Sequence, residues 1–256
     1  MSLIVVTNDD GIFSKGIKLL VSIAKKFGEV VVVAPDSPQS GMGHAITIGN
    51  TLRLDSTYLF GDKIEAYECS GTPADCVKFA KNYLLNGKNP DLVLSGINHG
   101  SNTSISVLYS GTMSAAIEGA LDGIPSIGFS LCDYDPNGYL DHTKPVIEKV
   151  IKQALKQGFM KGIALNVNIP AYVKDDPIKG IRVCRQSKST WNEKFEERED
   201  PYGRRYFWLG GDFVSHDKGE DTDEWAIAHN YVSIVPCQYD MTGHHAISDL
   251  NDHWEL

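Results

Sequence analysis

The chain has 256 residues, of which 42% are hydrophobic and 22% charged, a composition that is typical of a folded globular protein and excludes a disordered one. Its formal net charge of −9 argues against a nucleic-acid polymer as partner, because binding many phosphates requires clustered lysine and arginine. No apolar run reaches the roughly 18 residues of a membrane span and no basic leader precedes the first predicted strand, so we expect a cytoplasmic protein that does not contact a membrane.

Strand-like and helix-like segments alternate through the first half of the chain. Residues 29–34 contain four consecutive valines and are too continuously apolar for a strand with one solvated face, so they predict a central strand covered on both sides. Residues 15–27 repeat apolar side chains at helical spacing, and Gly28 is suited to end that helix as its C′ residue. The predicted strands are 3–7, 29–34, 92–95, 124–130 and 163–169, and the predicted helices are 15–27, 73–85, 112–121 and 145–157.

This alternation is typical of an α/β protein with a mostly parallel sheet and crossover helices. The pattern is clear over residues 1–170, which we interpret as the core that carries the chemistry. We expect 171–256 to form a C-terminal arm and the elements that close the fold, so that 1–256 is a single domain.

The last third of the chain has a different character. Residues 188–205 are rich in charge and lack helical or strand periodicity, whereas 206–209 are aromatic and strand-like. An aromatic strand beside a charged segment fits an arm that packs against a partner, and it equally fits a simple surface hairpin, so both interpretations stay open. Beyond it, 221–224 place acidic side chains at the start of a short helix, and 231–235 form a final strand.

The first predicted strand runs directly into two adjacent carboxylates. Asp9 and Asp10 follow the apolar residues 3–7 and are themselves followed by Gly11. In open α/β sheets the crevice beyond the carboxyl ends of the strands is where ligands bind, and two hard oxygen donors there suit a divalent cation. Asp-Gly is equally ordinary turn chemistry, so this segment alone leaves a structural role open.

Two further loops strengthen the case for a metal site. Ser40 lies in the loop after the second strand, and Asn98 lies in the loop after the strand at 92–95. If these strands are neighbours, Asp9, Asp10, Ser40 and Asn98 meet around one cation. Carboxylate, hydroxyl and amide oxygens suit magnesium, manganese or calcium better than zinc or copper. Such a cation makes a water more acidic and neutralises charge on a phosphoryl group.

The third loop ends in a candidate anion site. Ser110, Gly111 and Thr112 open a helix of small residues, and a helix start with free amides and hydroxyls is suited to phosphate, although a plain N-cap is the simpler interpretation. His44 and His99 lie in the candidate loops and are candidates to bind phosphate or to protonate the leaving oxygen. Loop histidines are more often merely solvated.

Four sequence motifs occur in order along the chain: Val6-Thr7-Asn8-Asp9-Asp10-Gly11-Ile12, then Gln39-Ser40-Gly41 with His44, then Ser95-Gly96-Ile97-Asn98-His99-Gly100-Ser101-Asn102, and finally Tyr109-Ser110-Gly111-Thr112. Together they resemble the SurE family of survival-protein phosphatases. The match is close from about residue 3 to 130, and the arm matches only loosely. The resemblance implies a Rossmann-like sheet with helices on both faces and C-terminal elements that build homodimers or homotetramers.

The resemblance also implies an activity and a site. It implies an enzyme that hydrolyses nucleoside monophosphates, commonly at the 5′ position, with one divalent cation, Mg²⁺ or Mn²⁺, in each subunit. We hypothesise that metal-activated water attacks the phosphorus, and whether either catalytic aspartate is also base or nucleophile stays open. The positions that match the family's cation ligands are Asp9, Asp10, Ser40 and Asn98, and the predicted phosphate-binding residues are Asn102, Ser110, Gly111, Thr112 and His44.

The alternative from another class is a non-catalytic, metal-dependent nucleotide-binding regulatory protein. It has the same fold and metal loop but releases no phosphate. No expected donor is missing from the sequence, so nothing favours this alternative. The sequence leaves open the base preference, the 5′ or 3′ position, activity on polyphosphate, the physiological cation and the oligomeric state.

Overall fold

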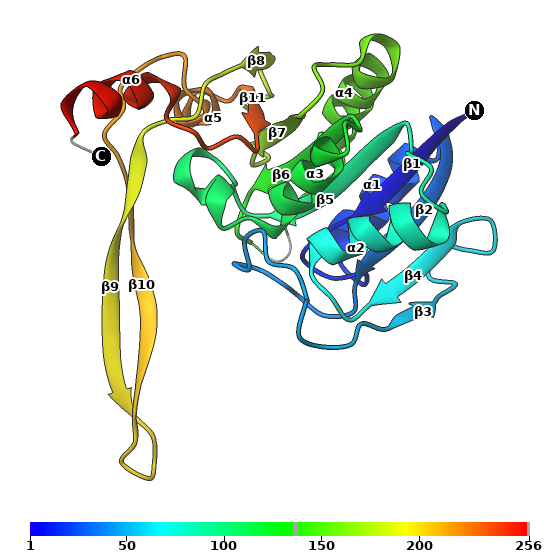
Figure 1. Ribbon diagram of the computed structural model, residues 1–256, viewed down its shortest axis with the longest axis horizontal. Coiled ribbons are helices and arrows are strands. Elements are labelled where there is room, and N and C mark those ends of the chain that lie inside the picture. The colour runs from blue at the N-terminus through cyan, green and yellow to red at the C-terminus, as the bar shows by residue number, and fades with distance from the viewer. Residues whose placement is uncertain (136–137, 255–256) are drawn as a thin grey trace.

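A mixed sheet of nine strands forms the centre of the computed structural model, which describes residues 1–135 and 138–254 (Figure 1). The strand order is β3-β4-β2-β1-β5-β6-β7-β11-β8. The strands are β1 (Ser2–Thr7), β2 (Gly28–Pro35), β3 (Leu54–Ser56), β4 (Glu65–Cys69), β5 (Leu92–His99), β6 (Ser126–Cys132), β7 (Ile163–Pro170), β8 (Ile181–Val183) and β11 (Val232–Gln238).

Most neighbouring strands of this sheet are parallel, as the α/β prediction requires. Only β3 on β4 and β11 on β7 run antiparallel. The predicted fold class is therefore confirmed, and β11 and β8, which come after Pro170, extend the same sheet. The helices are α1 (Lys15–Ala24), α2 (Pro73–Phe79), α3 (Gly111–Leu121), α4 (Lys144–Gln157), α5 (Asp223–Ala228) and α6 (His244–His253). Among the helices of the described residues, none combines the length and the hydropathy that a membrane crossing requires.

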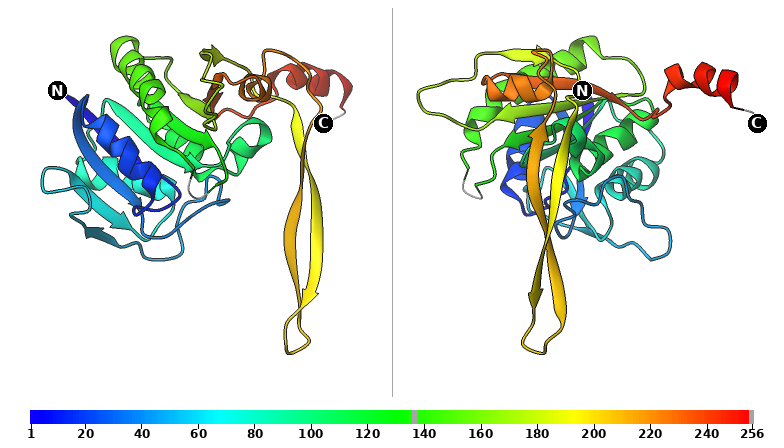
Figure 2. Two further views of the ribbon diagram at one scale, coloured as in Figure 1. Left: turned by 180° about the vertical axis from the view of Figure 1, so that it is seen from behind. Right: turned by 90° about the vertical axis from the view of Figure 1, so that its left-hand side faces the viewer.

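Helices cover both faces of the sheet because the strands are apolar on both sides. In β1, Ile4 and Val6 pack in the cluster that includes α1 and α4, whereas Val5 packs in the cluster that includes α2 and α3. The view from behind in Figure 2 shows α1 in front of the sheet, opposite to α2. Successive strand residues point to opposite faces, so a continuously apolar strand needs a cover on each side. Each such side chain stabilises the fold by about 1.5–3 kcal/mol.

Gly28 has a different role from the one the sequence predicted. Helix α1 ends at Ala24, and Gly28 is the first residue of β2 rather than a helix C′ residue. A Cβ at Gly28 would lie 2.1 Å from the carbonyl oxygen of Ser2. The glycine is therefore required by the close approach of β1 to β2. The sequence pattern that marks helix ends carries no information about this contact.

The C-terminal arm is a long β-hairpin. Strands β9 (Ser189–Glu199) and β10 (Arg205–Ser215) pair antiparallel and project from the body of the molecule (Figures 1 and 2). Residues 188–205 show no strand period in the sequence, yet most of them belong to β9 and to the turn of this hairpin. All residues of β9 except Ser189 are exposed, so neither face is buried and no alternation of apolar and polar residues arises to mark a strand. The short strands β3, β4 and β8 and the exposed helix α6 were also missed.

Gly16 in the first turn of α1 sets how closely this helix approaches β5. A Cβ at this position would lie 2.0 Å from the carbonyl oxygen of Ile97. We expect Gly16→Ala to lower the free energy of unfolding by about 1–3 kcal/mol, despite the better helix propensity of alanine, because the backbone must move apart. Urea denaturation measures this loss.

Gly49 is the matched control. No heavy atom lies within 4 Å of a Cβ built there, so Gly49→Ala should change stability by less than about 0.5 kcal/mol. Equal stabilities of the two variants would contradict the close packing of α1 on β5.

Candidate active site

The loop that carries the two acidic residues is held in place by Asn8. The side-chain nitrogen Nδ2 of Asn8 donates to the carbonyl oxygen of Gly11 and to Oγ of Ser14, both at 2.9 Å. The same Ser14 oxygen caps the start of α1. Asp9 and Asp10 are therefore fixed between the carboxyl end of β1 and the first turn of α1.

Asp9 lies against the first turn of α3. It is only 3% exposed, and its Oδ1 accepts a hydrogen bond of 2.5 Å from Oγ1 of Thr112. A Cβ at Gly111 would lie 2.7 Å from the Cβ of Asp9, so a larger residue could not begin α3 here without a shift. The predicted phosphate-binding start of α3 and the first predicted cation ligand are thus in direct contact.

The second loop and the end of β5 meet the first loop at the same edge of the sheet. Asn98 and His99, expected in the loop after a strand at 92–95, are the last two residues of β5, which is longer than predicted. The backbone N–H of Gln39 donates to the carbonyl oxygen of Asp9 at 2.7 Å, and the backbone N–H of His99 donates to Oδ2 of Asp10 at 3.2 Å. The carboxyl ends of β1, β2 and β5 therefore converge, as expected of neighbouring parallel strands.

The other two predicted cation ligands sit beside these contacts. Ser40 follows Gln39 and is exposed. Asn98 precedes His99, and its Nδ2 donates to the carbonyl oxygen of Gly100 at 2.8 Å, which leaves Oδ1 as the atom suited to a cation. Asp10 and Asn98 line the same cleft, of about 350 Å³.

The two carboxyl groups carry a charge that burial disfavours. The pKa of Asp9 is raised from 3.8 to about 6. Burial is the main cause and the neighbouring charge of Asp10 adds to it, whereas the hydrogen bond from Thr112 lowers the pKa and only partly offsets them. Burial also raises the pKa of Asp10. Within the described residues neither carboxylate forms an ion pair with a basic side chain. Two adjacent, poorly solvated carboxylates that form no such ion pair fit a divalent cation.

The surrounding residues narrow the kind of cation. The part of the chain that the structure describes contains no group of three or more His, Cys, Asp and Glu side chains placed to hold a metal ion. A cation at Asp9 and Asp10 must therefore take hydroxyl, amide or water oxygen as its other ligands, which is the preference of magnesium and manganese.

The predicted phosphate-binding residues Asn102 and Ser110 are buried at this edge. Oγ of Ser110 accepts from the backbone N–H of Met113 at 3.0 Å and so caps α3. The side chain of Asn102 donates to Oγ of Ser130 at 2.8 Å, and its backbone N–H donates to Oδ1 of Asn168 at 2.8 Å. Polar side chains of β6 and β7 thus hold the third loop in position.

The ring of His44 contacts α3 beyond its first turn, although the backbone N–H of Gly43 donates to the carbonyl oxygen of Tyr109 at 3.1 Å, directly before the helix. Its Nε2 lies 2.9 Å from Oε2 of Glu118, whose other carboxylate oxygen is 2.5 Å from Nζ of Lys78. Glu118 is two helical turns beyond Ser110 on α3. The sequence placed His44 in the correct loop, but it could not show that a buried glutamate on α3 binds the ring.

His99 contacts the acidic loop through its backbone rather than its ring. The ring nitrogen Nε2 lies 2.7 Å from the carbonyl oxygen of Asp135, in the segment after β6. The ring therefore connects the end of β5 to Asp135, which also lines the 350 Å³ cleft. Its backbone N–H meanwhile fixes Asp10.

Asp223 is a buried residue whose role sequence reasoning missed. It is fully buried, its Oδ2 accepts from the backbone N–H of Ser104 at 2.8 Å, and its Oδ1 accepts from that of Ser187 at 2.9 Å. Ser104 lies in the third loop, and Ser187 lies just before the hairpin. The sequence indicated only an acid at the start of α5, because nothing local marks these distant partners.

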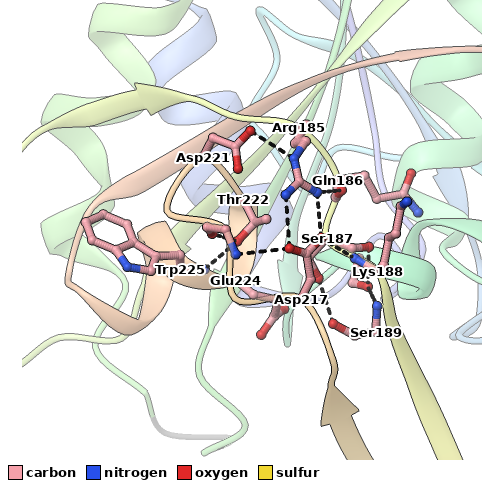
Figure 3. A network of polar contacts seen from close by, with 12 residues as sticks. Arg185, Gln186, Ser187, Lys188, Ser189, Asp217, Asp221, Thr222, Glu224 and Trp225 are labelled. Atoms are coloured by element: carbon pink, nitrogen blue, oxygen red, sulfur yellow. Dashed lines mark hydrogen bonds and ion pairs between the residues drawn. The ribbon is translucent and has the colours of Figure 1, made fainter.

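Ion pairs between charged side chains connect the two ends of the hairpin near the contacts of Asp223. Figure 3 shows the guanidinium of Arg185 between two carboxylates, with Nη1 at 2.5 Å from Asp217 and Nε at 2.9 Å from Asp221. The backbone N–H of Lys188 also donates to Asp217, at 3.2 Å. Together with Asp223 these contacts connect the root of the hairpin to the third loop of the site.

The fold and the site define an α/β protein whose candidate acidic site lies at the carboxyl edge of a mostly parallel sheet. The family model described as "Survival protein SurE" matches residues 4–193, and the chain belongs to this family. The chain is 63% identical to the 5'-nucleotidase SurE of Cytophaga hutchinsonii, over 99% of this chain and 97% of that protein, and 56% identical to the 5'-nucleotidase SurE of Flavobacterium psychrophilum, over 99% and 98%.

A solved structure agrees with this assignment. The SurE protein from Aquifex aeolicus is 38% identical and superposes with a TM-score of 0.83, covering 98% of each chain. The predicted family and fold are confirmed. The prediction that the chain is an enzyme is also confirmed, because relatives this similar over the whole length carry an enzyme's name.

Asp9→Asn removes a buried charge and preserves the shape of the side chain. Because the pKa of Asp9 is raised from 3.8 to about 6 in the folded chain, folding favours the protonated acid, and its contribution to stability falls as the pH rises between these values. We expect the metal-free Asp9→Asn variant to be more stable than the wild type at neutral pH, by about 3 kcal/mol at most. Urea denaturation with a chelator present measures this gain.

Two comparisons distinguish the removal of the buried charge from a general change in stability caused by the substitution. The gain should vanish near pH 4, roughly the pKa of an unfolded Asp, where wild-type Asp9 is protonated in the folded chain. Asp10→Asn should stabilise less, because Asp10 is less deeply buried. A neutral or lower stability of Asp9→Asn at neutral pH would contradict the unfavourable burial of this charge.

Proposed function

We propose that this chain is a divalent-metal-dependent phosphatase that hydrolyses nucleoside 5′-monophosphates to nucleoside and phosphate. The observation that carries the proposal is the contact of buried Asp9, beside Asp10, with the first turn of α3. This contact puts the proposed cation ligands next to the helix start that is proposed to bind the phosphate. The names of the two bacterial relatives support the nucleotidase activity.

The cation ligands in this proposal are Asp9, Asp10, Ser40 and Asn98, with one Mg²⁺ or Mn²⁺ in each subunit. Such a cation supplies charge neutralisation on the phosphoryl group and makes a water more acidic. The fit rests on the donor chemistry: two carboxylates of raised pKa, an exposed hydroxyl and an amide oxygen, all at one sheet edge.

The remaining residues position the substrate. In the proposal the non-bridging phosphate oxygens are bound by the backbone N–H groups at the start of α3 and by side chains near it. The residues of this predicted set are Asn102, Ser110, Gly111, Thr112 and His44. Thr112 donates to Asp9 and so fixes its carboxylate next to these donors. The attacking water must give up a proton, and Asp9 and Asp10 are the carboxylates at this edge that can accept it. Phosphoryl transfer depends mainly on such positioning and charge stabilisation.

Asp9→Asn and Asp10→Asn test the assignment. Each variant should lose phosphate release from AMP or GMP by a factor of about 10³ or more, because the cation loses a charged ligand and the water a proton acceptor. Asp55→Asn, which changes an exposed acid on β3, is the control and should retain activity. If purified Asp9→Asn or Asp10→Asn turns over at the wild-type rate, that residue is removed from the mechanism.

A panel of phosphate esters separates the enzyme from the non-catalytic alternative. The purified protein is incubated with 5′- and 3′-nucleotides, several bases and short polyphosphate, with Mg²⁺ or Mn²⁺ and with or without a chelator. Release of phosphate that the chelator abolishes supports the proposal. Tight nucleotide binding without release would establish the regulatory binding protein instead.

We also propose that the hairpin and the segment after it, within residues 171–256, form the contacts of a homodimer or homotetramer. The hairpin carries Trp191, Phe195, Phe207 and Trp208, and all four side chains are exposed in the single chain. Exposed aromatic clusters of this kind are typical of protein interfaces.

Charged substitutions on the hairpin test the assembly. The double variant Phe207→Glu and Trp208→Glu should lower the mass that light scattering measures at micromolar concentration, because it places charge within the apolar contact. Tyr83→Glu, which changes an exposed aromatic residue on the body, is the control and should leave the mass unchanged. A monomeric wild-type protein would exclude the proposed role of the hairpin.

A further inference from the structure

A cleft adjoins Asp10, and none of its lining residues comes from α3. It has a volume of about 350 Å³ and lies between the first loop, the end of β5 and the described residues Asp135, Gly138 and Leu140. This volume is within the range of sites for small organic ligands. Its lining includes Asp10, Phe13, Lys15, Asn98, His99 and Leu140.

The lining changes in character from one end to the other. Asp10 and Asn98 are two of the proposed cation ligands, so this end of the cleft adjoins the reacting phosphate. Phe13 and Leu140 provide aromatic and apolar surface, and Lys15 provides an ammonium group that forms no ion pair among the described residues. A nucleoside has the matching chemistry: a flat base with apolar faces, and a ribose whose hydroxyl groups accept and donate hydrogen bonds.

Phe13 is placed differently from its neighbour in the sequence. Ile12 is fully buried, whereas the Phe13 side chain is 57% exposed at the cleft. The apolar ring therefore contributes little to the core, yet it lies on a loop that Asn8 holds rigid. A rigid, exposed aromatic ring is a suitable surface for stacking a base, because every base has an apolar face.

We infer that this cleft holds the nucleoside part of the substrate, with the base stacked on the ring of Phe13. The inference rests on the proposed function and adds to it a residue that sets specificity. Phe13 favours nucleotides over phosphate esters that lack a base. Lys15 and the ring of His99, which line the same cleft, face the ribose.

A larger cavity near the site is the competing location. It has a volume of about 890 Å³ and is lined by His44, Leu108 and Ser114 together with the end of β11. None of Asp9, Asp10, Ser40 and Asn98 lines it. A nucleoside there would lie along α3, whereas the smaller cleft directly adjoins two of the proposed cation ligands. We therefore assign the nucleoside to the cleft beside Phe13.

Substrates with and without a base test this inference in the full-length protein. For Phe13→Ala, kcat/KM for AMP should fall about tenfold, mostly through KM, because stacking far from the phosphorus is uniform binding. The same variant should hydrolyse ribose 5-phosphate as the wild type does, and Phe13→Trp should restore the activity on AMP. Leu108→Ala is the matched control, since Leu108 is 51% exposed and lines the larger cavity.

The outcomes separate the subsite from other roles of Phe13. Equal losses on AMP and ribose 5-phosphate would overturn the inference, because they indicate a disturbed loop rather than lost stacking. No loss with Phe13→Ala, or an AMP-specific loss with Leu108→Ala, would also overturn it, the latter in favour of the larger cavity.

Binding of adenosine, which carries no phosphate, makes this test independent of catalysis. Calorimetry should show adenosine bound by the wild type and bound about tenfold more weakly by Phe13→Ala. If adenosine binds through Phe13 but the wild type releases no phosphate from AMP, the proposed function fails and the nucleoside subsite stands. If phosphate is released but Phe13→Ala binds adenosine as tightly as the wild type, the subsite fails and the proposed function stands.

Discussion

The contact between Asp9 and the first turn of α3 is the constraint on which the rest of the site depends. It brings together an acid at the end of β1 and a helix start that comes 103 residues later in the chain. It forms because β1 and β5 are neighbours in the sheet and because Gly111 leaves room for the carboxylate. The second loop then closes on the same acid through its backbone, so three separate segments share one edge.

The parts of the structure that the sequence predicted are those governed by local patterns and by the geometry of parallel sheets. Consecutive valines indicate a buried strand, and the rule that ligands bind beyond the carboxyl ends of parallel strands groups Asp9, Asp10 and Asn98 from the sequence alone. Ser110 was correctly expected to cap a helix, since that signal is contained within a few residues.

The parts that it did not predict depend on distant partners or on the absence of burial. His44 binds Glu118, which lies 74 residues away, and Asp223 accepts from the backbone of Ser104, which lies 119 residues away. No local pattern encodes such pairs. Strand β9 was missed for the opposite reason, because a strand with two solvated faces carries no hydrophobic period. Gly28 illustrates a further difficulty, because a glycine can end a helix or allow two strands to approach closely. Only the position of β1 in the structure shows that Gly28 does the second.

The separation of Asp9 from Thr112 along the chain has a consequence for how the protein is made. A ribosome adds about 5–20 residues per second, so the two acids emerge several seconds before the helix that packs against them. Until that helix arrives, the acids remain in water, where their charge costs little, and the burial that favours protonation begins only when α3 docks. The buried environment of Asp9 therefore arises only when α3, which is made later, packs against the end of β1.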